Sequence, residues 1–441
     1  MTDALASRLN AAAGDDEGFW DFRGKACRPH AHGLFRYPAM LVPGVTARLL
    51  TEVVEVDDAS SCFDPFVGAG TALTESQLAG LDFSGCDLNP LAVLLCQVKS
   101  GPLDTARFDE AINLAIADAT ADGSSTCEWR LPNCRKWFLK DVALKLSRLK
   151  RAIRSQTDAD VRRFLWVALA ESVRLSSNSR TSTVKLHLRS KEDLTTRDVD
   201  PISLFLLAAK RNVKLLLHLR EELATRNLLK KDRYSRQVSV GLRDAADSGD
   251  ANHDVMITSP PYGDNTTTIA YGQYAYLPLG WIDLTDIDSG SGHVNIEDAL
   301  DSTHAIDSLC LGGSKRGALQ VIDDLSECSE TFYDLRQQLS SEPRERLTRV
   351  TSFFRDLNST LDPILSSLCP EAAMIWVTGN RSVGGYRVPL DDILADLLVG
   401  RGCREVTRLE RRIPSKRMAV RNSVSDTMTR ESILVFRTSK G

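Results

Sequence analysis

The 441-residue sequence lacks the features that mark several classes of protein. It contains no run of about 18 apolar residues, so we expect no membrane-spanning helix. Residues 1–20 are polar and acidic, without the basic and apolar segments of a secretory signal. The ten cysteines include no CxxC pair, which indicates reduced thiols in a cytoplasmic protein.

Cys27, His30 and His32 are close enough in the sequence to suggest a metal site. No fourth ligand follows at a spacing typical of zinc sites. We therefore interpret this segment as coil near a domain edge and expect no metal centre.

The net charge of −4 excludes a uniformly basic surface, but the charge is unevenly distributed. Residues 131–240 contain 25 Lys and Arg against 11 Asp and Glu, which gives this stretch +14 and the remainder −18. A basic segment on an acidic body is expected where one part of a protein meets a polyanion. The alternative, that these charges lie on solvated faces of long helices, stays open.

Hydrophobic patterning near the N-terminus predicts the first half of a doubly wound α/β sheet. Strands are predicted over Val53–Asp64 and Leu81–Asp87, and helices over Thr71–Ala79 and Pro90–Val98. Residues 104–231 then read almost entirely as helix, and a strand resumes the α/β pattern at His253–Thr258.

The C-terminal part continues this alternation after an acidic, Ser- and Gly-rich stretch at residues 283–317, which we expect to be an irregular, mobile loop. Further helices are predicted over Asp324–Leu339, Ser352–Leu368 and Leu390–Leu398, and further strands over Ala372–Val377 and Ser432–Arg437. The chain therefore divides into an α/β part (1–100), a basic helical insertion (101–236) and a second α/β part (237–441).

The segment DPFVGAGT, Asp64 to Thr71, joins the first strand to the first helix. Gly68 and Gly70 permit a tight turn that holds a nucleotide-like cofactor against the N–H groups of a helix. Asp87, at the end of the next strand, is suited to accept hydrogen bonds from ribose hydroxyls. Alternatively, Asp87 only caps the following helix. Neither GxGxxG nor GxxxxGK[ST] is present, which excludes a P-loop and disfavours a nicotinamide site.

The segment TSPPYG follows the strand that ends at Thr258. Pro260 and Pro261 fix the backbone, and the Tyr262 ring provides a surface on which an extruded base could stack. Ser259 and the Pro260 carbonyl could accept hydrogen bonds from an amino group. Taken singly, the segment is equally compatible with a purely structural turn.

Together, the two segments resemble the S-adenosylmethionine-dependent amino-methyltransferases of DNA, which combine FxGxG with [S/D/N]PP[Y/F]. The resemblance implies a class I, Rossmann-like α/β fold with seven mostly parallel strands, to which this sequence adds the helical insertion at residues 101–236. It also implies methyl transfer from S-adenosyl-L-methionine to a flipped base in double-stranded DNA. The serine of SPPY favours cytosine N4 over adenine N6, and both remain open.

The resemblance assigns roles to particular residues. Asp64 would lie near the methionine amino group of the cofactor, Phe66 beside the cofactor, and Asp244 near its adenine amino group. Tyr37 belongs to FRYPAMLVPG, which resembles the segment beside the methionine part. The expected cofactor-binding residues are Tyr37, Asp64, Phe66, Gly68, Gly70, Thr71, Asp87 and Asp244, and the expected catalytic residues are Ser259, Pro260, Pro261 and Tyr262.

The position of the helical segment departs from the family pattern, which leaves the target-recognition region in doubt. Residues 131–240, and especially 176–190, are the first candidate, and the basic run 408–422 is the second. A restriction–modification setting, with a possible cognate restriction endonuclease, follows from the resemblance alone. The alternatives are an RNA base amino-methyltransferase and a catalytically silent DNA-binding subunit.

Overall fold

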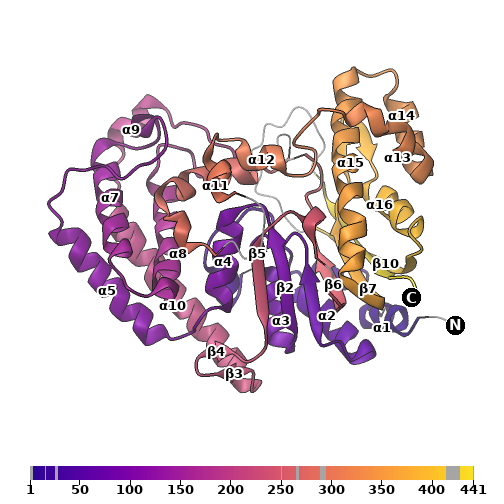
Figure 1. Ribbon diagram of the computed structural model, residues 1–441, viewed down its shortest axis with the longest axis horizontal. Helices are drawn as coiled ribbons and strands as arrows, with labels where there is room; N and C mark the ends of the chain where they lie inside the picture. Colours follow the sequence, from indigo (N-terminus) through magenta and orange to yellow (C-terminus); the bar gives the residue numbers. More distant parts are fainter. Residues whose placement is uncertain are drawn as a thin grey trace.

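Seven strands pair into one central sheet in the computed structural model of the protein (Figure 1). The structure describes residues 3–14, 16–24, 28–249, 251–264, 268–288, 295–413 and 428–440. The strand order is β10–β11–β7–β6–β1–β2–β5. The five strands β1, β2, β5, β6 and β7 run parallel, and β11 is antiparallel to both of its neighbours. These strands are β1 Ser61–Asp64, β2 Asp82–Asp87, β5 Val238–Leu242, β6 His253–Thr258, β7 Leu368–Thr378, β10 Arg404–Arg412 and β11 Arg430–Arg437. The predicted seven-stranded, mostly parallel Rossmann-like fold is confirmed.

Alternate residues of the central strands pack on opposite faces of the sheet, as the two-residue repeat of a strand requires. In β6, Val255 and Ile257 are fully buried on the face covered by α1 (Ala4–Ala13), α2 (Pro43–Asp57) and α3 (Thr71–Ala79). Met256 faces the other side, toward α15 (Arg344–Ser366) and α16 (Leu390–Val399). The sheet is therefore buried on both faces, as expected for parallel strands.

The first predicted strand is wrong at its N-terminal end. Residues 53–57 belong to helix α2, and β1 begins only at Ser61. Val45, Leu49 and Val53 recur at a spacing of four and are buried on one helix face, so the VVEV sequence continues the helical pattern. Asp58 ends the helix in the left-handed conformation.

The helical region lies between α4 (Pro90–Ser100) and β5 and forms the left half of Figure 1. Its helices are α5 Thr105–Ala121, α6 Cys134–Trp137, α7 Lys140–Arg154, α8 Ala159–Ser176, α9 Lys191–Thr196 and α10 Pro201–Thr225, followed by the ribbon of β3 (Leu229–Lys230) and β4 (Arg233–Tyr234). Residues 164–170 of α8 are all buried, so this helix is the core of the region. Among the described helices, none is both long and apolar enough to cross a membrane.

The C-terminal helices cover the other end of the sheet. They are α13 Ile322–Cys328, α14 Glu330–Leu339, α15 and α16, with a small ribbon of β8 (Arg381–Val383) and β9 (Tyr386–Val388). The single helix predicted over residues 324–339 is broken, because Ser329 caps α14 by accepting the N–H of Phe332 and also donates to Asp396 Oδ2 at 2.7 Å. Strand β10 was not predicted.

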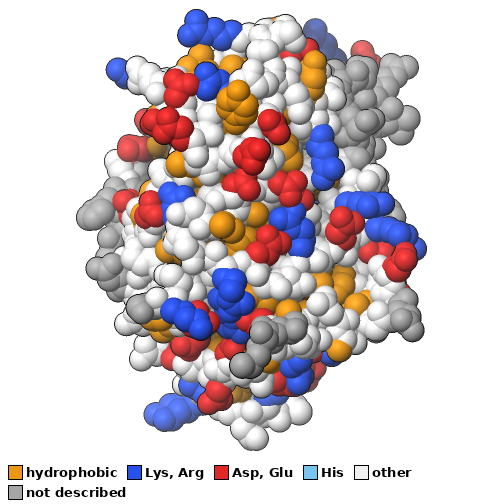
Figure 2. Space-filling model, turned by 90° about the vertical axis from the view of Figure 1, so that its right-hand side faces the viewer, with side chains coloured by type: hydrophobic (Ala, Val, Ile, Leu, Met, Phe, Trp, Pro, Cys, Tyr) orange, Lys and Arg blue, Asp and Glu red, His pale blue; other side chains and the backbone are white. Residues whose placement is uncertain are grey.

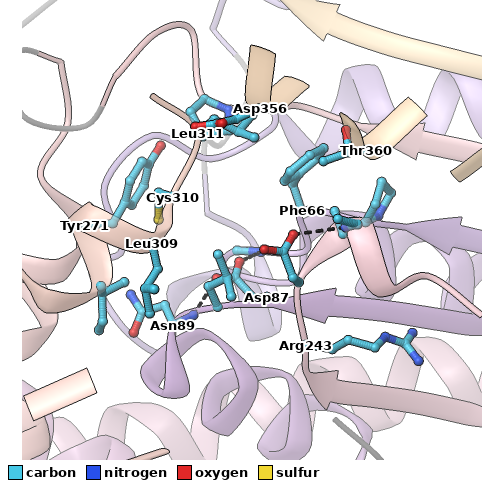
Figure 3. Close-up of a pocket in the computed structure, with 18 of the residues that line it drawn as sticks. Phe66, Asp87, Asn89, Arg243, Tyr271, Leu309, Cys310, Leu311, Asp356 and Thr360 are labelled. Carbon is cyan, nitrogen blue, oxygen red and sulfur yellow. Dashed lines mark hydrogen bonds between the residues drawn. The ribbon is translucent and has the colours of Figure 1, made fainter. Parts of the chain in front are cut away.

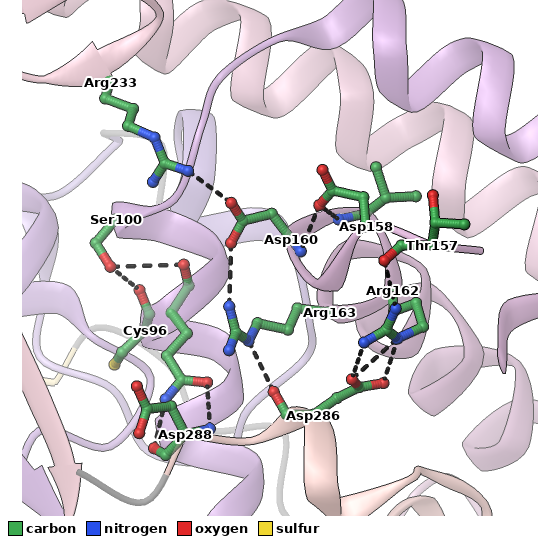
Figure 4. Close-up of polar contacts among 12 residues, drawn as sticks. Cys96, Ser100, Thr157, Asp158, Asp160, Arg162, Arg163, Arg233, Asp286 and Asp288 are labelled. Atoms are coloured by element: carbon green, nitrogen blue, oxygen red, sulfur yellow. Dashed lines mark hydrogen bonds and ion pairs between the residues drawn. The ribbon is translucent and has the colours of Figure 1, made fainter.

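The acidic stretch 283–317 is more ordered than the sequence predicts. It contains η4 (Leu284–Asp286), η5 (Ile296–Leu300) and α12 (Ala305–Leu309), while residues 289–294 lie outside the described part. Asp286 is buried and accepts from Arg162 Nη2 at 2.7 Å (Figure 4). It also accepts from Trp166 Nε1 at 2.7 Å. Asp307 is also buried and accepts the N–H groups at the start of α11 (Tyr271–Trp281). Asp286 therefore fastens the stretch to the helical region, and Asp307 fastens it to α11.

Replacing Asp286 by alanine should lower the free energy of unfolding by about 2–4 kcal/mol, because the buried Trp166 N–H and two guanidinium nitrogens of Arg162 lose their acceptor. Urea unfolding followed by circular dichroism measures the change. Asp301→Ala, an exposed carboxylate in the same stretch, is the matched control and should stay within about 0.5 kcal/mol of wild type. Equal effects of the two substitutions would contradict a fastening role for Asp286.

Candidate active site

A cavity of about 320 Å³ opens at the carboxyl ends of the parallel strands (Figure 3). This is the edge of an open α/β sheet where ligands bind, and the volume lies in the range of small-molecule sites. Segments far apart in the chain form its walls. The predicted site residues that line it are Tyr37, Phe66, Gly68, Asp87, Asp244, Ser259 and Pro261.

The glycine turn after β1 is held in place from behind. Gly68 and Gly70 have φ of +48° and +69°, which favours glycine at both positions. Lys99 on α4 is buried and donates from Nζ to the carbonyls of Ala69 (2.6 Å) and Gly70 (3.1 Å). A Cβ on Gly70 would lie 2.8 Å from Cys96 Sγ, whereas one on Gly68 would meet nothing closer than 3.7 Å. Gly68 therefore lies on the cavity side of the turn, and Gly70 packs against α4.

Asp87 joins the glycine turn to the end of β2. Its Oδ2 accepts the N–H of Gly68 at 2.9 Å, and its Oδ1 accepts the N–H of Asn89 at 2.8 Å. The side chain of Asn89 caps α4 by accepting the N–H of Leu91, so the alternative that Asp87 is merely the cap of this helix is wrong. Burial raises the pKa of Asp87 to about 6, and its carboxylate keeps lone pairs for a ligand.

Two tyrosines form an aromatic wall beside Asp87. The rings of Tyr37 and Tyr271 stack with centroids 5.8 Å apart, and the hydroxyl of Tyr37 accepts from Asn89 Nδ2 at 3.1 Å. Tyr271 is the first residue of α11, which the acidic stretch holds through Asp307. Asn89 and Tyr271 were not predicted from the sequence. The Asn-Pro pair at 89–90 is a helix-start signal that could have pointed to the first, and no local pattern marks the second.

Asp64, Gly70, Thr71, Pro260 and Tyr262 are not among the lining residues. Asp64 is buried beneath the cavity, where its Oδ1 accepts from Thr258 Oγ1 at 2.6 Å and from the N–H of Phe66 at 3.0 Å. Burial raises the pKa of Asp64 to about 7. This carboxyl group ties the end of β1 to the end of β6, and its role toward a cofactor stays a prediction.

The SPPY segment presents Ser259 and Pro261 to the cavity and turns the hydroxyl of Tyr262 away from it. Ser259 Oγ donates to the hydroxyl of Tyr262 at 3.1 Å, which in turn donates to Glu431 Oε1 at 3.1 Å. The Tyr262 ring lies close to Gly379, where an added Cβ would be 2.8 Å from its Cδ2. Glu431 was not predicted from the sequence, because it lies on the last strand, far from any motif.

The wall opposite β1 and β2 was not predicted either. It comes from residues 308–311 of the acidic stretch and from Asp356 and Thr360 on α15. Asp356 Oδ2 accepts the N–H of Gly312 at 2.9 Å, which joins the two segments. Asp244, which lines the cavity near Arg243, accepts the N–H of Ala246, and burial raises its pKa.

The two histidines discussed as possible metal ligands meet a carboxyl group behind the glycine turn. His32 Nε2 lies 2.7 Å from Glu75 Oε1, and ligand atoms of His30, His32 and Glu75 lie within 4.8 Å of one another. The buried Lys99 ammonium is a charge partner of Glu75, whose pKa burial raises to about 8. Cys27 lies outside the described residues. The expectation of no metal centre stays a prediction.

The strand order and the cavity at the carboxyl edge define a Rossmann-like methyltransferase fold. The chain is similar over nearly its whole length to the Type II methyltransferase M.MvaI of Kocuria varians, with 28% identity over 459 aligned positions that cover 99% of this chain and 96% of that protein. Type II methyltransferase M.MjaII of Methanocaldococcus jannaschii is 28% identical over 83 residues, which is 19% of this chain and 15% of that protein. These relatives support a methyltransferase.

No protein-family model matches the chain. Among solved structures, the rRNA methyltransferase aviRa from Streptomyces viridochromogenes aligns over 91% of this chain and 86% of its own, with 13% identity. The TM-score of 0.28 is too low for this likeness to bear on fold or substrate.

The carboxyl group of Asp87 should titrate with a midpoint of about 6, because burial disfavours its charged form. Carbon-13 NMR of the side-chain carboxyl groups across pH 3–9 measures this midpoint, and Asp87→Asn identifies the signal by its loss. The cavity would then carry this negative charge only above about pH 6. A midpoint close to the ordinary aspartate value would contradict the buried placement of the carboxyl group.

Proposed function

We propose that the protein is an S-adenosylmethionine-dependent DNA methyltransferase that modifies an exocyclic amino group of a base. Cytosine N4 is the favoured target, and adenine N6 is the alternative. One observation carries the proposal: Asp87 and Ser259, which are 172 positions apart in the sequence, line the same cavity. A cofactor-binding carboxylate and an acceptor for an amino group thus share one space. The Type II methyltransferase relatives support DNA as the substrate.

The residues present fit the proposed cofactor. Asp87 offers free lone pairs for ribose hydroxyls, and Gly68 leaves room for close approach of a ligand to the backbone. Asp244 with its neighbours Arg243 and Ala245 lines the part of the cavity suited to an adenine ring. Tyr37 and Phe66 supply apolar and aromatic surface beside it. Asp64 would act from beneath, by holding the turn that presents Phe66.

S-adenosylmethionine supplies a methyl group on a sulfonium sulfur, and transfer leaves the electron pair of the broken carbon–sulfur bond on sulfur. The amino nitrogen of the base forms the new bond to the methyl carbon and gives up one proton to solvent. Ser259 Oγ, which lines the cavity, would accept an N–H hydrogen bond from the amino group. The carbonyl of Pro260, which lies between the lining residues Ser259 and Pro261 in the sequence, is the second proposed acceptor. These acceptors orient the nitrogen and stabilise the positive charge that develops on it.

Residues 177–190, called here the 177–190 loop, are the proposed contact surface for DNA. An antiparallel bridge between Ser179 and Leu188 braces it, and the N–H of Leu186 donates to Gln273 on α11. Helix α11 begins at Tyr271 in the cavity wall, so the loop lies next to the site. Arg180 is exposed, and its backbone is fixed by a hydrogen bond to His187. Such a loop can contact phosphates beside a flipped base.

The second candidate, residues 408–422, is less suited to phosphate binding in its described part. Arg408 pairs with Asp392, Arg411 with Glu431 and Arg412 with Glu17, so these guanidinium groups already have acidic partners. On the face over the C-terminal elements, basic and acidic side chains are interspersed (Figure 2). Residues 414–422 lie outside the described part of the chain.

The methylated product tests the proposed function directly. DNA methylated by the purified protein, digested to nucleosides and analysed by mass spectrometry, should contain N4-methylcytosine. Ser259→Ala should lower the methylation rate by about 10²–10³-fold with cofactor affinity preserved, because it removes an acceptor for the developing charge. N6-methyladenine would reverse the choice of base. Methylated RNA together with unmodified DNA would favour an RNA methyltransferase. A protein that binds DNA but does not bind the cofactor would be a catalytically silent subunit.

The salt dependence of DNA affinity tests the 177–190 loop. Arg180→Ala in the loop is combined with Lys191→Ala, the exposed first residue of α9 directly after the loop. The pair should make the slope of log affinity against log salt concentration shallower by about 0.9 for each phosphate that is left without its cation. Lys230→Ala with Lys231→Ala is the matched control, because these exposed lysines belong to the same basic stretch but lie at the β3–β4 ribbon, at the bottom of Figure 1. A changed slope in the control pair alone would place the DNA surface elsewhere.

A further inference from the structure

The hydroxyl group of Ser259 is the first member of a hydrogen-bonded chain that ends on a charged pair. It donates to Tyr262, which donates to Glu431 Oε1, each over 3.1 Å. Glu431 Oε2 pairs with Arg411, its neighbour across the β10–β11 ladder. Arg411 is buried, and its Nε donates to the carbonyl of Trp20 at 3.3 Å. The chain therefore runs from the cavity wall to the far edge of the sheet.

The chemistry of the last two groups fixes the direction of every hydrogen bond in this chain. A guanidinium group only donates hydrogen bonds, and a carboxylate only accepts them. The hydroxyl proton of Tyr262 must therefore point at Glu431, which leaves the phenol oxygen to accept the proton of Ser259. Burial raises the pKa of Tyr262 well above its ordinary value, so the phenol keeps this proton. Ser259 is then left with lone pairs only on the side that faces the cavity.

We propose that Glu431, acting through the hydroxyl of Tyr262, holds Ser259 as a hydrogen-bond acceptor toward the amino group of the substrate base. Glu431 is thus a positioning residue, and this inference rests on the proposed function. A serine hydroxyl that could rotate would also donate to the nitrogen lone pair that must attack the methyl group. The chain removes this competing orientation, so the Tyr262 hydroxyl has a task beyond any stacking by its ring.

Glu431→Gln should reverse the chain with little change of shape. The single amide oxygen would face Arg411, which can only donate, and the NH₂ group would then donate to Tyr262. Tyr262 would donate to Ser259, and Ser259 would turn its proton toward the cavity. The single-turnover methylation rate should fall by about 10–100-fold, while the dissociation constant of S-adenosylmethionine should stay within about twofold of wild type.

Tyr262→Phe cuts the chain and supplies the decisive comparison. It should lower the single-turnover rate by about tenfold, because Ser259 becomes free to rotate. Adding Glu431→Gln to Tyr262→Phe should cause no further loss, since the two groups act through one connection. Glu410→Gln is the matched control on the same strand pair, because its exposed carboxylate pairs with Arg430 away from the cavity, and it should keep the wild-type rate.

The outcomes separate this inference from the function on which it rests. If the wild-type protein methylates a base and the Glu431→Gln variant keeps the full rate, the positioning role of Glu431 is overturned and the proposed function stands. Additive losses in the double variant, or an equal loss in Glu410→Gln, would mean a general structural effect and would also overturn it. Wild-type protein that binds the cofactor but methylates no base would overturn the proposed function, and the inference with it.

Discussion

The hydrogen bond from Thr258 to Asp64 joins the two parts of the chain on which the site depends. Thr258 ends β6 and precedes SPPY, and Asp64 ends β1 and precedes the glycine turn. The parallel pairing of β1 with β6 brings these ends together, and the 2.6 Å hydrogen bond fixes their relative height. Because both groups are buried, this bond is protected from water and ties the two turns to each other.

The sheet and the cavity floor could be predicted because they follow from local patterns. The strand ending at Asp64, the turn at Gly68 and the strand ending at Asp87 are encoded within a few residues of one another. In a parallel sheet, the carboxyl ends of neighbouring strands meet at one edge. Asp87 and Ser259 could therefore be expected to lie together on the strength of the sequence alone.

The remaining walls could not be predicted, because their residues have no local signature. Tyr271, Asp356 and Glu431 reach the site through long-range contacts, and each would look like an ordinary surface or core residue in its own segment. The acidic stretch was predicted to be an irregular loop, and here the sequence led to too little predicted order. Asp286 and Asp307 of this stretch are buried, and they accept hydrogen bonds from Arg162 and from backbone N–H groups, respectively. Their partners also account for part of the positive charge of the helical region.

The place of β11 between β7 and β10 imposes an order on folding. Within the described sheet, β10 pairs only with β11, although β10 comes first in the chain. The earlier strand cannot join the sheet until the later one has been inserted beside β7, so these two strands must dock as a hairpin or in reverse sequence order. Pairing of this kind closes long loops before the strands are stabilised by their neighbours, which slows folding. Arg411 and Glu431 face each other across this strand pair, so their ion pair forms when β10 pairs with β11 and not when β11 joins β7.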